Sequence, residues 1–260
     1  MPKILAIANQ KGGVGKTTTC VNLAASLSAN RRRVLLVDMD PQGNATTGCG
    51  LDKDELSPTN YEWLMGEAGL AEVRRRVDDA GFDLLPANGD LTAAEVALMD
   101  ADARESRLRG LLQELDRPYD YVLVDCPPSL NILTVNALVA AHRVFIPIQC
   151  EYYALEGLSA LLNTIRRVQQ TANPELEIEG LLRTMFDPRN NLALQVGAQL
   201  LAHFDDKVYR TQIPRNVRLA EAPSHGQPVL QYDRTSRGAV AYMALASEML
   251  RREGAALRAG

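Results

Sequence analysis

The sequence predicts an α/β fold built on a mostly parallel, twisted sheet with helices on both faces. Short apolar runs, rich in β-branched residues, alternate with longer stretches of helical character along the 260 residues. Uninterrupted apolar runs of this length are typical of parallel strands, because helices cover both faces of such a sheet. The predicted strands are residues 3–8, 34–37, 82–85, 121–124, 144–148 and 178–182.

Helical periodicity is clearest in residues 155–168, where apolar side chains recur at three- and four-residue steps. Core packing explains this stripe. A last core helix is predicted from Val240, Met243, Leu245 and Met249-Leu250. Residues 50–115 show only short helical pieces around the strand 82–85, and we interpret them as a decorated crossover. We therefore expect a single domain over residues 1–260.

Composition is that of an ordinary globular chain, with 46% hydrophobic and 23% charged residues. Neither a secretory signal nor a run of ~18 apolar residues is present. The four cysteines stand far apart without a Cys-x-x-Cys pair, which predicts free thiols in a reducing cytoplasm. A net charge of −4 argues against wholesale nucleic-acid binding, and the arginine clusters at 31–33, 74–76 and 166–167 are interpreted as solvated helix faces or turns.

The most informative stretch is glycine-rich and covers residues 10–18, between the first strand and a helical segment at 19–25. A strand, a glycine-rich turn and a helix start form an anion cradle of backbone N–H groups. In such a cradle Lys16 reaches the β- and γ-phosphates, and the Thr17 hydroxyl holds Mg²⁺. The strict pattern G-x-x-x-x-G-K-[ST] is not met, because Gln10 takes its first position and a second lysine, Lys11, precedes the glycines.

Carboxylates end two further strands. Asp38 and Asp40 follow the strand 34–37, and Asp125 follows 121–124. The carboxyl ends of parallel strands meet at the edge where open α/β sheets bind ligands, which is also the edge of the glycine-rich loop. Carboxylates there hold Mg²⁺ through water or orient an attacking water. Taken alone, Asp125-Cys126-Pro127-Pro128 favours a strand-terminating turn, but its shared edge with the other motifs reverses that preference and favours a site.

These motifs resemble those of a known family. Lys-Gly-Gly-Val-Gly-Lys-Thr-Thr, residues 11–18, resembles the deviant Walker A motif of the ParA/MinD group of P-loop ATPases. Residues 38–44 are similar to the ParA switch I signature, and residues 124–129 to Walker B with switch II. Residues 149–157 and 213–223 are close to segments of the short chromosomal ParA proteins called Soj, and the resemblance spans about residues 3–250. It implies a P-loop NTPase fold of the deviant Walker A type.

The resemblance also implies roles for single residues, with ATP and Mg²⁺ as cofactors. Lys11 would act in trans on the nucleotide of a second subunit, like an arginine finger. Asp38 and Asp125 would support the metal shell with Thr17, and Asp40 would position the hydrolytic water. The implied catalytic residues are Lys11, Lys16 and Asp40; the nucleotide-binding residues are Lys11, Gly12, Gly13, Val14, Gly15, Lys16, Thr17 and Thr18, with Pro214 and Asn216 at the adenine; the DNA-contacting residues are Arg189 and Arg218, with Arg215 as a further candidate.

The function implied is that of an ATP-switched partition ATPase in the cytoplasm, associated with the nucleoid. ATP favours a homodimer that binds double-stranded DNA without sequence preference, and hydrolysis stimulated by a ParB-type partner releases it. The alternative is a MinD-like ATPase on the membrane surface, which needs a C-terminal amphipathic helix; the tail 254–260 is short and poor in apolar residues, so we expect no membrane partner. An iron–sulfur reductase of the nitrogenase iron-protein type is a third option, but Cys126 does not match its cluster context.

Overall fold

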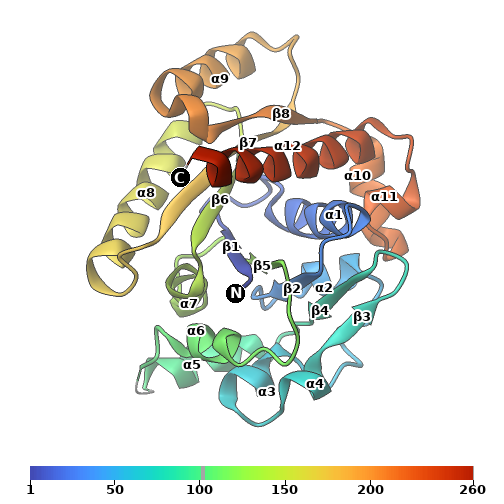
Figure 1. The fold of residues 1–260 in the computed structure, drawn as a ribbon, viewed down its shortest axis with the longest axis vertical. Helices are drawn as coiled ribbons and strands as arrows, with labels where there is room; N and C mark the ends of the chain where they lie inside the picture. Colours follow the sequence, from blue (N-terminus) through green and yellow to red (C-terminus); the bar gives the residue numbers. More distant parts are fainter. Residues whose placement is uncertain (101–102, 260) are drawn as a thin grey trace.

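The computed structural model describes residues 1–100 and 103–259, with side chains through residue 255. Within these residues eight strands form one sheet in the order β3-β4-β2-β5-β1-β6-β7-β8 (Figure 1). Neighbouring strands run parallel except for the antiparallel pair β3 and β4, so the predicted fold class is confirmed. The strands are β1 Lys3–Ile7, β2 Val34–Asp38, β3 Arg75–Val77, β4 Phe82–Leu85, β5 Tyr121–Asp125, β6 Arg143–Gln149, β7 Glu177–Phe186 and β8 Val208–Pro214.

Helices cover both faces of this sheet, because side chains alternate between the faces along each strand. In β1, Leu5 and Ile7 join one apolar core, while Ile4 and Ala6 join the other. The first core lies against α1, α11 and α12, and the second against α3 and α5 to α9 (Figure 1). The helices are α1 Lys16–Ala29, α2 Asn44–Gly48, α3 Asn60–Met65, α4 Leu70–Val73, α5 Leu91–Met99, α6 Arg107–Gln113, α7 Ile132–Ala140, α8 Ala154–Thr171, α9 Asn191–Phe204, η1 Asp205–Lys207, α10 Val217–Glu221, η2 Ala222–His225, α11 Val229–Tyr232 and α12 Arg237–Ala259.

The last helix differs from its prediction at one residue. Leu245 and Met249 of α12 are buried as expected, but Val240 is 57% exposed, so placing it in the core was wrong. The buried stripe runs through Ala239 and Tyr242 at three- and four-residue steps, and Val240 falls beside it. Residues 254–259 of the tail belong to α12. None of the described helices combines the length and the apolar content that crossing a bilayer requires.

The strand β3 was not predicted, and it corrects the interpretation of the arginine cluster at 74–76. Arg75 and Arg76 are strand residues rather than part of a solvated helix face or turn. Arg76 Nη1 lies 3.1 Å from Asp83 Oδ1 on β4, so the strand pairing brings the cation to a buried carboxylate. Three residues are too few to show a period-2 pattern, which explains why this strand was not predicted.

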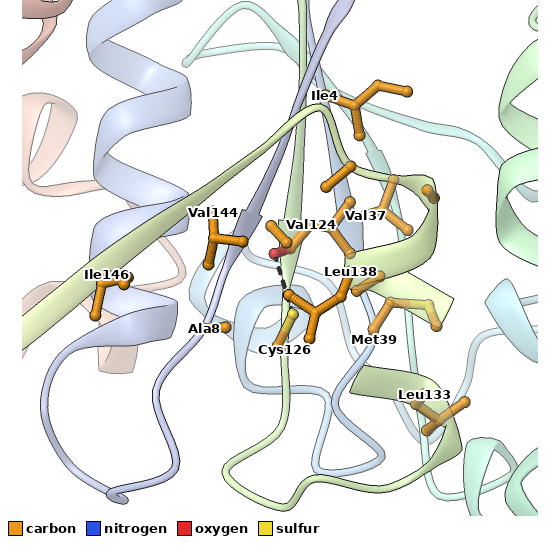
Figure 2. Packing of buried hydrophobic residues seen from close by; sticks show 14 of the residues in the cluster. Ile4, Ala8, Val37, Met39, Val124, Cys126, Leu133, Leu138, Val144 and Ile146 are labelled. Atoms are coloured by element: carbon orange, nitrogen blue, oxygen red, sulfur yellow. Dashed lines mark hydrogen bonds between the residues drawn. The ribbon is translucent and has the colours of Figure 1, made fainter. Parts of the chain in front are cut away.

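Cys126 is a core residue. It follows β5 and lies in the same apolar cluster as Val124, Met39 and Leu138, with 1% of its surface exposed (Figure 2). Burial raises the pKa of the Cys126 thiol well above its usual range. A protonated, enclosed thiol packs as a small apolar side chain and is inert. Cys126 therefore anchors the loop after Asp125 in the apolar core.

Candidate functional site

The loop between β1 and α1 forms an open cradle of backbone groups. Gly13 and Gly15 have φ angles of 73° and 87°, a left-handed conformation that glycine adopts without strain. A Cβ built on Gly12 or Gly13 would meet no atom of the described residues within 4 Å, so the space in front of the loop is open. Gly15 precedes α1, and no described side chain caps the first turn of this 14-residue helix. Free N–H groups at such a helix start favour an anion.

Lys16 is the first residue of α1, and its ammonium lies over the loop. Lys16 Nζ donates a hydrogen bond to the carbonyl oxygen of Lys11 at 3.2 Å, and the residue is only 7% exposed. Burial lowers the pKa of Lys16, and the charge of Asp125 opposes that shift. A buried cation that contacts a neutral carbonyl gains strongly from an anion placed in the loop.

Three aspartates meet at the carboxyl ends of the neighbouring strands β2 and β5. Asp38 and Asp125 are register partners and fully buried, and Asp40 follows two residues after Asp38. Burial raises the pKa of Asp38 to about 6. Burial, reinforced by the charge of Asp38, raises the pKa of Asp125 to about 8. Two buried carboxyl groups this close favour a bound cation between or beside them.

The oxygens of these two buried carboxyl groups differ in their contacts. Asp38 Oδ2 accepts hydrogen bonds from Thr46 N and Oγ1 at 2.9 and 2.8 Å, and Oδ1 accepts one from a backbone N–H at 3.2 Å. Asp125 Oδ2 is buried without a hydrogen-bond partner among the described residues. Hydrogen bonding from Thr17 counteracts the rise in the pKa of Asp125. An unpaired carboxylate oxygen near a threonine hydroxyl fits Mg²⁺, which prefers oxygen ligands and takes few of them from protein.

The three predicted motifs line one cavity of about 460 Å³. Its walls combine the cradle and Lys16 with Asp40 and with Pro128 from the loop after β5. The remaining wall comes from α2 and η2, of which Thr47 and Gly48 lie outside every motif identified in the sequence. The lining residues are Gly12, Gly13, Gly15, Lys16, Thr17, Asp40, Gln42, Asn44, Thr47, Gly48, Pro128 and Pro223.

The two residues predicted at the adenine do not line this cavity. Pro214 ends β8, and Asn216 stands immediately before α10. Asn216 Oδ1 is buried and has no hydrogen-bond partner within the described part of the chain. An unpaired buried amide oxygen is a ready acceptor for an amino group. Pro223 of η2, nine residues after Pro214, is the nearest lining residue in the sequence.

Lys11, predicted to act on a second subunit, contacts its own chain here. Lys11 Nζ lies 2.7 Å from Glu151 Oε2, just after β6, and the two side chains are 35% and 46% exposed. The backbone N–H of Lys11 donates to Asn9 Oδ1 at 3.0 Å, and Asn9 Nδ2 donates to the carbonyl oxygen of Pro147 at 2.7 Å. The lysine is therefore tied to β6 through both its backbone and its ammonium.

The predicted DNA-contacting arginines lie just after the ends of two adjacent strands, β7 and β8. Phe186 and Pro214 are register partners at the ends of β7 and β8, and Arg189 and Arg218 follow them. Arg189 Nη2 lies 2.8 Å from Asp187 Oδ2, and hydrogen bonding from this guanidinium lowers the pKa of Asp187 to about 2. The structure thus places both arginines beyond the same sheet edge as the cavity.

Local carboxylates partly neutralise Arg218 as well. Arg218 Nη1 lies 2.8 Å from Glu221 Oε2, and Nε lies 3.3 Å from Asp233 Oδ2. Arg215, three residues earlier, is exposed. A polyanion that binds Arg218 must compete with these two carboxylates.

Two glycines join the α2 and η2 walls of the cavity. A Cβ on Gly226 would lie 2.5 Å from the Cα of Gly50, and a Cβ on Gly50 would lie 2.8 Å from the carbonyl oxygen of Gly226. Both glycines have positive φ, 84° for Gly50 and 63° for Gly226. Any side chain here pushes one backbone away from the other.

Gly226→Ala should therefore lower the free energy of unfolding by about 2–5 kcal/mol, from left-handed backbone strain and from overpacking against backbone. Urea unfolding measures the change. The matched control is Gly66→Ala, which has a similar φ of 81° but whose Cβ meets only the end of the Arg107 side chain. An equal decrease in the free energy of unfolding in the two variants would show that backbone strain accounts for the whole effect and that the contact with Gly50 contributes nothing.

Comparisons with known proteins agree with this geometry. A sequence model of the AAA domain matches residues 2–178. The chain is 53% identical to the sporulation initiation inhibitor protein Soj of Bacillus subtilis, covering 96% of this chain and 98% of that protein, and 52% identical to the chromosome partitioning protein ParA of Caulobacter vibrioides, covering 96% and 95%. A Mycobacterium smegmatis structure described as cobyrinic acid a,c-diamide synthase, with bound ADP and magnesium, superposes with a TM-score of 0.85 at 40% identity over 98% of this chain and 96% of that one. The chain belongs to the ParA/Soj family of chromosome-partitioning P-loop ATPases.

Proposed function

We propose that this ATPase is a DNA-partitioning switch. Two ATP-bound subunits form a sandwich dimer, the dimer binds double-stranded DNA without regard to sequence, and hydrolysis stimulated by a ParB-type partner releases it. The observation that carries the proposal is the single cavity in which the phosphate cradle, Lys16 and Asp40 meet. ATP and Mg²⁺ are its cofactors, in keeping with the ADP and magnesium of the Mycobacterium structure. We place the protein in the cytoplasm, on the nucleoid.

Residues that line the cavity and residues next to it hold different parts of the nucleotide. N–H groups at the start of α1 and the Lys16 ammonium bind the β- and γ-phosphates. Thr17 and Asp125 hold Mg²⁺, which neutralises phosphate charge when bound. Asp38 has hydrogen bonds on both oxygens, so it supports the metal through its charge and fixes the segment up to Thr46. The buried Oδ1 of Asn216 would accept a hydrogen bond from the adenine amino group, and Pro214 would border the adenine site.

Hydrolysis depends on a water placed in line with the γ-phosphate. Asp40 Oδ1 accepts a hydrogen bond from Gln42 N at 3.0 Å, which fixes the carboxylate at the cavity wall. From there it orients the attacking water. Lys11 completes the site of the second subunit in the manner of an arginine finger.

In this proposal, DNA binds because dimerisation brings arginine side chains of both subunits together on one surface. The chain has a net charge of −4, so a monomer is a poor ligand for phosphate. Arg189 and Arg218 lie beyond neighbouring strand ends, and a two-fold dimer presents each of them twice, with Arg215 beside them. Because each arginine has an acidic neighbour, DNA must displace Asp187 and Glu221, which makes affinity modest and sensitive to salt.

Arg189→Glu or Arg218→Glu should abolish ATP-dependent DNA binding while dimerisation persists. The test is co-sedimentation of the Asp40→Ala protein with non-specific DNA across a salt series, with and without each arginine change. Each phosphate contact contributes about 0.9 to the slope of log affinity against log salt, so the four arginine contacts of a dimer with both residues intact should contribute a slope of about 4 in magnitude.

Arg166→Glu is the matched control, since it makes the same charge change at a position on α8 away from these strand ends. It should leave the binding intact. Undiminished binding by both test variants would reject this surface and leave residues 31–33 and 74–76 as candidates. A parallel series with anionic liposomes distinguishes the alternative function, because ATP-dependent pelleting with lipid but not DNA would indicate a membrane-surface ATPase.

A further inference from the structure

Hydrogen bonds to both partners hold the ion pair between Lys11 and Glu151 in place. Glu151 follows β6, and its other carboxylate oxygen accepts a hydrogen bond from Gln149 Nε2. Its backbone N–H donates to the carbonyl oxygen of Gln149 at 2.9 Å. On the lysine side, Asn9 binds both the backbone of Lys11 and the carbonyl oxygen of Pro147 in β6. The carboxylate is thus placed by its own strand to meet this ammonium.

We infer that Glu151 is a positioning residue that retains Lys11 in its own subunit, so that the nucleotide of a second subunit must compete for it. The inference rests on the proposed trans role of Lys11. An ammonium that moves to a partner's phosphates either leaves the Glu151 carboxylate without its cation or brings this carboxylate toward the polyphosphate. Both outcomes oppose dimerisation, since one separates opposite charges and the other brings like charges together.

The ion pair between Lys11 and Glu151 is partly exposed to solvent, so its effect on the dimerisation equilibrium is moderate. An ion pair of this exposure shifts an equilibrium by about threefold. Formation of a two-fold dimer breaks two such pairs, one in each subunit, so the combined effect on the dimer dissociation constant is about tenfold. A triphosphate, with more negative charge near the interface, overcomes this competition more readily than a diphosphate. Glu151 therefore makes the dimer depend on the γ-phosphate.

The experiment measures the dimer dissociation constant of the full chain in the Asp40→Ala background by sedimentation velocity, with saturating ATP or ADP and Mg²⁺. Glu151→Gln should tighten the ATP dimer about tenfold and produce a detectable ADP dimer. The control is Glu156→Gln, an exposed glutamate in the first turn of α8 that changes net charge equally. It should leave the constant unchanged.

A second pair of variants tests whether Glu151 acts through Lys11. In a Lys11→Ala background, Glu151→Gln should lose its effect, because the ammonium that it retains is gone. A weaker or unchanged ATP dimer in Glu151→Gln would overturn the inference, and so would an equal tightening in the Lys11→Ala background. If the Asp40→Ala protein with intact Glu151 and its Glu151→Gln variant both fail to dimerise with ATP, the proposed function itself is rejected. A normal ATP dimer that ignores Glu151→Gln rejects only the inference.

Discussion

Lys16→Ala should weaken ATP binding about 100-fold and remove ATP-dependent dimerisation. The Lys16 ammonium is buried at the start of α1, where its one hydrogen bond to the described residues goes to a loop carbonyl, so its hydrogen bonds go to phosphate when ATP binds. Hydrogen bonds to charged groups contribute about 1.5–3 kcal/mol each, and losing one or two of them accounts for the expected factor. Calorimetric titration with ATP and Mg²⁺ measures the affinity, and sedimentation measures the dimer.

The control for this variant is Lys207→Ala, which removes a lysine from η1, the turn that precedes β8. Its ATP affinity should match that of the wild type. Thr17→Ala should also lose the dimer, through weaker metal binding, which a titration of Mg²⁺ at fixed ATP detects. Normal ATP affinity and dimerisation in Lys16→Ala would refute the assignment of the phosphate loop.

Asp40→Ala should slow ATP hydrolysis about 10²- to 10⁴-fold, the usual contribution of a side chain that positions or deprotonates an attacking water. ATP binding and dimerisation should survive, because the proposed phosphate and metal contacts come from other residues. The protein should consequently remain on DNA. Phosphate release in single-turnover conditions gives the rate, and co-sedimentation gives the bound fraction.

Asp54→Ala, an exposed aspartate 14 residues further along the chain, is the control and should hydrolyse ATP normally. Removing Lys11 should differ from both variants: its monomer should bind nucleotide, yet the dimer site should fail to hydrolyse it. Wild-type turnover in Asp40→Ala would contradict the assignment of residues 38–44 as switch I.

The sequence was most informative where its signals are local. A buried parallel strand is a continuous apolar run, so four of the strands were predicted to within one residue at each end and Phe82–Leu85 matched its observed bounds, while β7 extends four residues beyond its predicted end. The motifs at Lys16, Asp40 and Asp125 were predictable together because each follows such a strand, and parallel strands place their carboxyl ends at one edge.

What the sequence did not show arises from contacts between distant segments. The far wall of the cavity, with Thr47 and Pro223, depends on α2 meeting η2 through the two glycines at 50 and 226. The pair of Lys11 and Glu151 joins residues 140 positions apart. Neither residue carries a local pattern that indicates its partner, so these features required the fold.

The strand order has a consequence for how the chain is made. β1 lies between β5 and β6, so the strand before the phosphate loop has no neighbour until residues 121–149 have left the ribosome. A nascent chain that ends before them holds every residue of the loop from Gln10 to Thr18 but lacks both strands that flank β1 in the sheet. Such pairings between distant segments close late, because the entropy of a long loop must be overcome first. ATP, which stabilises only the folded state that binds it, therefore cannot assist the early part of synthesis.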